Sequence, residues 1–243
     1  MASDASPGFR PALIVVDMQE DFCIPNPLGV QGGRELVPVV NEVLGFPGFV
    51  IRVATQDFHP ASHISFATNH PPPNNRPFES CIRMRNPVSG RQPESVSQRL
   101  WPIHCVQNTP GAELLPDLNV GLLDVVVKKG MDERVEMYSG FADAFGNIDC
   151  VATGGASADL TVILMDKGVT DVFVVGLAGD YCVKYTALDA AKNGFRAYMV
   201  EEGTKYVDPR DGQQQTKAQF ATEGVMVVGL DSPELMRVKM ATT

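Results

Sequence analysis

The sequence contains no apolar run long enough to cross a membrane. Of its 243 residues 44% are hydrophobic, but no run approaches the roughly 18 consecutive apolar residues of a transmembrane helix. The apolar stretch at residues 12–16 is also too short for the core of a signal peptide. We therefore expect a cytoplasmic protein with no membrane partner.

Basic residues are in short supply. Twenty Lys and Arg face 29 Asp and Glu, which gives a formal net charge of −9 at pH 7. A chain with this balance repels polyanions, so we expect no nucleic acid and no anionic membrane surface among its partners. The glycine pairs at 32–33 and 154–155 fit neither G-x-G-x-x-G nor a phosphate-binding loop. The sequence therefore gives no support for nucleotide binding.

Cysteine and histidine are also few. The five cysteines are odd in number and widely spaced, and no two of them form a C-x-x-C pair. That pattern is a poor disulfide framework and does not suit a zinc ribbon, so we expect reduced thiols. One of the five is then available as a nucleophile. The chain has only four histidines, so even a pair of histidines in one site is half of all that it contains.

Six short runs rich in β-branched residues, each bounded by turn residues, form the main structural pattern. Several are apolar without alternation, which is typical of strands covered on both faces of a parallel sheet. Apolar stripes or alanine-rich stretches at 35–44, 157–167 and 182–193 predict helices between some of them. We therefore predict an α/β fold: a doubly wound, mostly parallel six-stranded sheet with helices on both faces, in three Rossmann-like layers. The predicted strands are 13–16, 50–54, 125–128, 172–176, 197–200 and 225–228.

Residues 67–99 interrupt this alternation. The segment is rich in proline and carries several arginines. We interpret it as a long irregular excursion, a lid or interface loop and not a domain of its own. The chain 1–243 is then predicted to be one domain.

Reactive side chains follow the ends of four predicted strands. They are Asp17 after the first, Asp57 and His59 after the second, Lys129 after the third and Cys182 after the fourth. Right-handed crossovers place the carboxyl ends of these strands at one edge of the sheet, where ligands bind in open α/β folds. A carboxylate, an amine and a thiol at one edge predict a catalytic site.

Each of these residues also has an ordinary structural explanation. Asp17, taken alone, is better explained as a helix cap than as a proton carrier whose pKa is raised by burial. Lys129 fits a solvated lysine, and only one of Lys128 and Lys129 can face the site because strand side chains alternate. Cys182 is predicted to open a helix with Asp180 as its N-cap, where the helix dipole and a nearby lysine lower the pKa of a thiol. The alternative is a small buried hydrophobic residue, which we favour for the other four cysteines.

Asp57 and His59 form a D-x-H pair that suits a metal site, together with His104 in W-P-I-H-C. One carboxylate and two imidazoles fit zinc, iron or manganese, with water in the open positions. His63, four residues after His59, is the next candidate ligand, and its alternative role is a structural hydrogen bond. We predict one divalent metal, with zinc ahead of iron and manganese.

Five motifs in this order resemble the nicotinamidase branch of the isochorismatase-like cysteine hydrolases. They are V-D-M-Q-E-D-F at 16–22, D-F-H-P-A-S-H-I-S-F at 57–66, W-P-I-H-C at 101–105, K-G at 129–130 and G-L-A-G-D-Y-C-V at 176–183. The resemblance runs from about residue 11 to 230, nearly the whole chain. It implies the isochorismatase-like fold, a homo-oligomer, and hydrolysis of nicotinamide to nicotinate and ammonia for NAD salvage.

The resemblance also implies roles for particular residues. The family's functional positions fall on a catalytic triad of Asp17, Lys129 and Cys182, metal ligands Asp57, His59 and His104, and an aromatic ring clamp of Phe22, Trp101 and Tyr181. A cis peptide would join Leu177 to Ala178, and the backbone N–H groups of Ala178 and Cys182 would form an oxyanion hole. Gly179 departs from the family, which often has a threonine-like residue there.

Other functions stay open at this point. The nearest is another amidohydrolase of the same superfamily, acting on a different aromatic amide such as pyrazinamide or on a carbamoyl or ureido compound. A non-catalytic binding protein would be expected to lack at least one triad residue, and none is lacking. A vinyl-ether hydrolase, the isochorismatase reaction itself, would not need Cys182.

Overall fold

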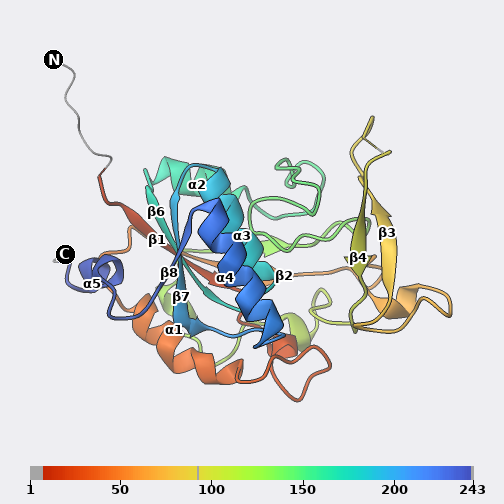
Figure 1. Cartoon of the computed structure of the whole chain (residues 1–243), viewed down its shortest axis with the longest axis horizontal. Helices are drawn as coiled ribbons and strands as arrows, with labels where there is room; N and C mark the ends of the chain where they lie inside the picture. Colours follow the sequence, from red (N-terminus) through yellow and green to blue (C-terminus); the bar gives the residue numbers. More distant parts are fainter. Residues whose placement is uncertain (1–7, 92, 242–243) are drawn as a thin grey trace.

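A computed structural model describes residues 8–91 and 93–241, and its centre is a six-stranded sheet (Figure 1). The strand order is β5-β2-β1-β6-β7-β8, and every neighbouring pair is parallel. All six predicted strands are confirmed, with small shifts at their ends. They are β1 (Pro11–Val16), β2 (Ile51–Asp57), β5 (Val125–Lys129), β6 (Asp171–Gly176), β7 (Arg196–Thr204) and β8 (Val225–Val228).

Helices cover both faces of the sheet, as predicted (Figure 1). The three predicted helices are present as α1 (Val37–Leu44), α2 (Leu160–Asp166) and α3 (Cys182–Lys192). The sequence pattern missed α4 (Asp211–Glu223) and α5 (Pro233–Lys239). The helix α4 has a mostly polar sequence with only Thr216 and Phe220 buried, so it carries no apolar stripe to recognise. Short 3₁₀ turns lie at Glu20–Phe22, Arg34–Leu36, Ala67–Asn69, Pro110–Ala112 and Val120–Leu122.

Alternate residues of the central strands pack into two separate hydrophobic cores, one on each face of the sheet. Leu13 and Val15 of β1 pack into the core beneath α1 and α5, whereas Ile14 and Val16 pack into the core beneath α2, α3 and α4. This division follows from the two-residue period of a strand. Because both faces are covered, β1 is buried along its whole length. Packing on both faces therefore fixes the positions of the carboxyl ends of the central strands.

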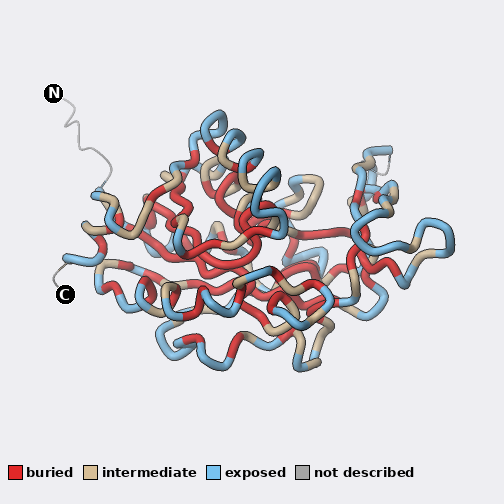
Figure 2. The backbone as a smooth tube through the Cα atoms, turned by 60° about the horizontal axis from the view of Figure 1, so that its bottom comes forward, coloured by how far each residue is buried: buried red, intermediate tan, exposed pale blue. Residues whose placement is uncertain are grey.

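The segment 67–99 is not the irregular loop that the proline content suggested. It contains an antiparallel hairpin of β3 (Cys81–Arg85) and β4 (Ser95–Arg99), which stands apart from the main sheet (Figure 1). The prolines lie outside both strands, where they remove no ladder hydrogen bond. Half of the residues in the two strands are exposed (Figure 2), but Met84 and Gln98 are buried against the body of the protein.

The sheet order reverses between β1 and β6. The chain passes from β1 to β2 on one side, and β6 pairs with the other edge of β1. In doubly wound sheets this reversal opens a crevice at the carboxyl ends of the two strands. Asp17 directly follows β1, and residues 177–182 directly follow β6. None of the helices in the described ranges is both long and apolar enough to cross a membrane.

Candidate active site

Asp17, Lys129 and Cys182 meet at the carboxyl edge of the sheet. The ammonium Nζ of Lys129 lies 3.0 Å from Oδ2 of Asp17 and 3.5 Å from Sγ of Cys182. The same Nζ lies 2.5 Å from Oδ1 of Asp57 and 3.1 Å from the backbone oxygen of Met137. All of these side chains are buried. A carboxylate, an amine and a thiol are therefore in mutual contact away from bulk water.

Asp17 is held in place by its backbone and by Thr55. Its φ of 48° lies in the left-handed region, and its backbone N–H donates to the carbonyl of Thr55 at 3.2 Å. The hydroxyl of Thr55 donates to Oδ1 at 2.6 Å. Burial raises the pKa of Asp17 to about 6, with Lys129 opposing that shift and Asp57 adding to it. A carboxyl group with this pKa can exchange a proton near neutral pH.

Cys182 opens α3, as predicted, but the expected low pKa of its thiol is wrong. Burial raises the pKa of Cys182 well above its ordinary value; Lys129 lowers it, but the nearby carboxylates Asp17 and Asp57 add to the increase. The predicted N-cap role of Asp180 is also wrong, because Tyr181 occupies the N-cap position. The carboxylate of Asp180 instead accepts hydrogen bonds from two backbone N–H groups at 207 and 208. The thiol therefore needs a base to remove its proton.

Lys129 and its neighbour Lys128 face opposite sides of β5. Lys129 is fully buried in the site, whereas Nζ of Lys128 lies 3.8 Å from the ring centre of Phe58. Burial alone would lower the pKa of Lys129, but Asp17 and Asp57 outweigh it and raise that pKa well above its usual range. The lysine is therefore a permanent cation between two carboxylates.

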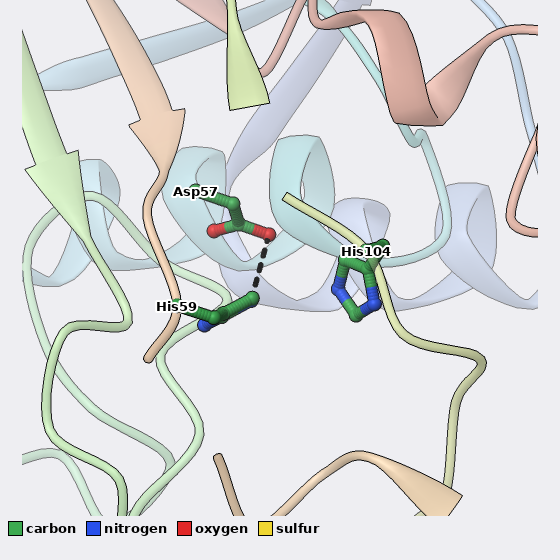
Figure 3. A group of neighbouring side chains, drawn as sticks. All are labelled: Asp57, His59 and His104. Carbon is green, nitrogen blue, oxygen red and sulfur yellow. Dashed lines mark ion pairs between the residues drawn. The ribbon is translucent and has the colours of Figure 1, made fainter. Parts of the chain in front are cut away.

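Asp57, His59 and His104 form a second cluster next to the first (Figure 3). One ligand atom of each lies within 4.8 Å of those of the other two. In both histidines Nδ1 lies near a backbone carbonyl, of Gly130 at 2.7 Å and of Pro102 at 2.8 Å. A carbonyl oxygen only accepts, so Nδ1 carries a hydrogen in both rings and Nε2 is the nitrogen that can bind a metal.

Charges in this cluster favour a cation. Nε2 of His59 is buried without a hydrogen bond, 3.4 Å from Oδ2 of Asp57. Burial would raise the pKa of Asp57, but Lys129 and His59 lower it below its usual range, so it is ionised. Burial, together with His59, lowers the pKa of His104 to about 4, which leaves this ring neutral at pH 7. Burial would lower the pKa of His59, but Asp57 raises it, so His59 must release its Nε2 proton when a metal binds. The ionised carboxylate and the two Nε2 atoms then fit a divalent metal.

Two further groups lie against this cluster. The ring of His63 lies 4.1 Å from that of His59, and its nitrogens contact the Ser65 hydroxyl at 2.9 Å and the Val135 carbonyl at 3.2 Å. These contacts match the structural hydrogen-bond role considered for His63. The buried carboxylate of Glu136 lies within 4.8 Å of a nitrogen of each of these two rings. Sequence reasoning missed Glu136 because it lies in the loop after β5 and belongs to no recognised motif.

A cavity joins the two clusters. It is lined by Cys182, Asp57 and His104 and by the three aromatic residues of the expected ring clamp, Phe22, Trp101 and Tyr181. The rings of Trp101 and Tyr181 meet edge to face with centres 5.0 Å apart. Tyr138, which sequence reasoning missed, also lines this cavity. A flat aromatic molecule suits such walls.

The loop between β6 and α3 contributes Ala178 and Tyr181 to the cavity lining, and Cys182 follows them at the start of α3. The Leu177–Ala178 peptide bond is cis. The N–H of Ala178 donates no hydrogen bond within the described residues, and the N–H of Cys182, in the first turn of α3, has no partner inside the helix. A Cβ atom on Gly179 would lie 2.4 Å from the ring of Tyr206. The departure from a threonine-like residue is thus explained, since the Tyr206 ring fills that space.

Comparison with known proteins finds one matching family and several similar chains. Residues 11–232 match the Isochorismatase domain family. The chain is 36% identical over 236 residues to a nicotinamidase of Schizosaccharomyces pombe, covering 95% of this chain and 98% of that protein. The yeast nicotinamidase bound to the inhibitor nicotinaldehyde superposes with a TM-score of 0.80 at 30% identity, covering 90% and 99% of the two chains. A pyrazinamidase of Pyrococcus horikoshii in complex with zinc gives 0.65 at 33% identity, covering 90% and 99%.

Replacing Lys129 tests the charge balance of the site. In metal-free protein at pH 7, Lys129→Met is expected to lower the free energy of unfolding by about 3–5 kcal/mol, because two buried carboxylates lose their cation. The deficit should shrink as the pH is lowered, since protonated carboxyl groups need no counter-charge. Urea unfolding at several pH values measures both effects. Lys128→Met is the matched control, and an equal loss in the two variants would contradict this explanation.

Proposed function

This chain belongs to the isochorismatase domain family, and we propose that it is a nicotinamidase that hydrolyses nicotinamide to nicotinate and ammonia through a thioester on Cys182. The observation that carries the proposal is the contact of Cys182 with Lys129, next to Asp17, in a cavity with aromatic walls. This activity supplies nicotinate for NAD salvage. The aromatic walls favour a flat aromatic amide over an aliphatic carbamoyl or ureido compound.

The first step forms the covalent intermediate. The carboxylate of Asp17 accepts the thiol proton of Cys182, and one of its oxygens lies within 4.8 Å of Sγ. The sulfur then attacks the carboxamide carbon, and Lys129 stabilises the negative charge that the proton leaves behind. The raised pKa of the thiol makes a nearby base necessary, and Asp17 is the base in place.

The second step releases ammonia. The carboxamide oxygen takes up negative charge in the tetrahedral intermediate and accepts hydrogen bonds from the N–H groups of Ala178 and Cys182. Asp17 returns its proton to the amide nitrogen, the C–N bond breaks, and ammonia leaves behind a nicotinoyl thioester. Water then adds to this thioester with Asp17 again accepting a proton, and nicotinate is released with the thiol restored.

One divalent metal would be held by Asp57, His59 and His104, and zinc suits this donor set best. When bound, it would supply a Lewis acid that attracts the pyridine nitrogen or orients a water. The aromatic residues orient the substrate. Phe22, Trp101 and Tyr181 enclose the pyridine ring of nicotinamide and direct its carboxamide toward Cys182. A cytoplasmic location, a homo-oligomer and a single domain over 1–243 stay predictions of the sequence.

Ammonia release from nicotinamide tests the proposal directly. The purified wild type with bound metal should release ammonia, and Cys182→Ala should lower kcat/KM at least about a thousandfold because it removes the nucleophile. Cys81→Ala, which alters an exposed thiol in β3, should retain wild-type activity. No turnover by the wild type at micromolar enzyme would contradict the function, whereas an active Cys182→Ala variant would contradict the mechanism.

The pH profile tests the role of Asp17. Only the ionised carboxylate can accept the thiol proton, and the pKa of Asp17 is raised to about 6. We therefore expect kcat/KM to rise with pH, with a midpoint about 6, and to fall tenfold for each pH unit below it. Metal content is measured at each pH so that metal loss is not mistaken for protonation. Full activity at pH 5, or an active Asp17→Asn variant, would exclude Asp17 as the base.

The metal ligands are tested by metal content. Elemental analysis of the purified protein is expected to find about one divalent ion per chain, and His104→Ala should lose most of it. His70→Ala is the matched control, because the His70 side chain bonds to the Ile64 carbonyl through Nε2 and is not part of the Asp57–His59–His104 cluster. Removal of the ion by a chelator should abolish activity, and added zinc should restore it. Equal metal content in the two variants would place the metal elsewhere.

A further inference from the structure

The β3–β4 hairpin reaches the catalytic cavity through the last two residues of β4. Gln98 is buried, and its Nε2 donates to the hydroxyl oxygen of Tyr138 at 2.8 Å. Arg99 donates to the hydroxyl of Tyr181 at 3.1 Å, and its guanidinium carbon lies 5.8 Å from the ring centre of Trp101. Both tyrosines line the cavity. The hairpin therefore supports the cavity wall from behind, through these two tyrosines and Trp101.

The hydrogen bonds around Tyr138 have a fixed direction. Nε1 of Trp101 contacts its hydroxyl oxygen at 3.0 Å, and an indole nitrogen can only donate. The amide of Gln98 is held the same way round, because its Nε2 also donates to the backbone carbonyl of Arg99 at 2.7 Å. The hydroxyl oxygen of Tyr138 therefore accepts two hydrogen bonds. Its own hydrogen is used by neither partner.

Within residues 8–91 and 93–241, no group accepts the hydroxyl hydrogen of Tyr138. The side-chain hydrogen bonds of Tyr138 there are the two that its oxygen accepts from Gln98 and Trp101. The ring stacks on Tyr185, with centres 5.5 Å apart and planes 17° apart, which fixes its plane. Burial raises the pKa of Tyr138 well above its ordinary value, and a thiolate at Cys182 is close enough to raise it further. The phenol thus stays protonated near the nucleophile.

We propose that Tyr138 donates this hydrogen to an oxygen of the ligand, the carboxamide oxygen of nicotinamide or the carboxylate of nicotinate, and that Gln98 is the positioning residue that keeps the hydrogen available. The inference rests on the proposed function, which supplies these ligands. A hydrogen bond to a charged acceptor is stronger than one to a neutral acceptor. Nicotinate binding therefore depends on Tyr138 more than nicotinamide binding does.

Trp101 provides the readout, because it is the single tryptophan of the chain and lies in the cavity wall. Its fluorescence is titrated with nicotinate, and kcat/KM for nicotinamide is measured in parallel. Tyr138→Phe should raise the Kd for nicotinate about tenfold or more and lower kcat/KM roughly three- to tenfold. Ser97→Ala, an exposed change on the same strand, should match the wild type.

Variants of Gln98 separate this role from a merely structural one. Gln98→Glu supplies an oxygen that accepts the hydrogen of Tyr138, so it should reproduce the loss of Tyr138→Phe although the hydroxyl is still present. Gln98→Met removes one donor without adding an acceptor and should lose less. The alternative is that Tyr138 only holds Trp101 in place. Gln98→Glu leaves the hydrogen bond between Trp101 and Tyr138 intact, so in that case nicotinate binds as in the wild type. That result would overturn the proposal.

Stability is followed by thermal unfolding of each variant. If Gln98→Glu does not fold, the double variant Gln98→Met/Tyr138→Phe decides. Its nicotinate affinity should equal that of Tyr138→Phe, because Gln98 acts only through Tyr138, and a further loss would contradict this. Wild-type affinity in a folded Tyr138→Phe variant would also overturn the proposal. If the wild type releases no ammonia from nicotinamide, the proposed function has failed, which is a separate result.

Discussion

The rest of the site depends on the ion pairs that the buried ammonium group of Lys129 makes with two carboxylates. The two carboxylates lie beside it, and both are buried: Asp17 is fully enclosed, and Asp57 is 3% exposed. Without a cation between them, two buried like charges would drive one another toward protonation. With it, they divide into different states: Asp57 is ionised, and Asp17 has its pKa near neutrality. Lys129 lowers the pKa of both carboxyl groups, and the two imidazoles beside Asp57 lower the pKa of that group further.

The parallel sheet makes this arrangement possible. Because β1, β2, β5 and β6 are neighbours in parallel register, their carboxyl ends deliver side chains from distant parts of the chain to one edge. The reversal of strand order at β1 and β6 leaves room there for a ligand. The two clusters then share one cavity, which is lined by both His104 and Cys182, so one aromatic amide can contact both. This is why we assign them to one reaction.

Much of this was predictable from the sequence, because the strands are apolar runs and the reactive residues follow them directly. Other parts had no local signal. The hairpin strands are short and rich in arginine, so their proline-rich surroundings dominated the pattern. Glu136 and Tyr138 enter the site only because the loop after β5 folds back over the cavity. The pKa shift predicted for Cys182 is wrong in direction, because burial of the thiol outweighs the lysine beside it.

We propose that the reaction passes through a covalent nicotinoyl thioester on Cys182. The most direct measurement is intact-protein mass spectrometry of wild-type enzyme quenched in acid within milliseconds of mixing with nicotinamide, followed by peptide mapping. We predict an added mass of one nicotinoyl group on the peptide that contains Cys182, and none in Cys182→Ala. Rapid ammonia release with no adduct at any time, even with a slowly hydrolysed amide analogue, would contradict the account.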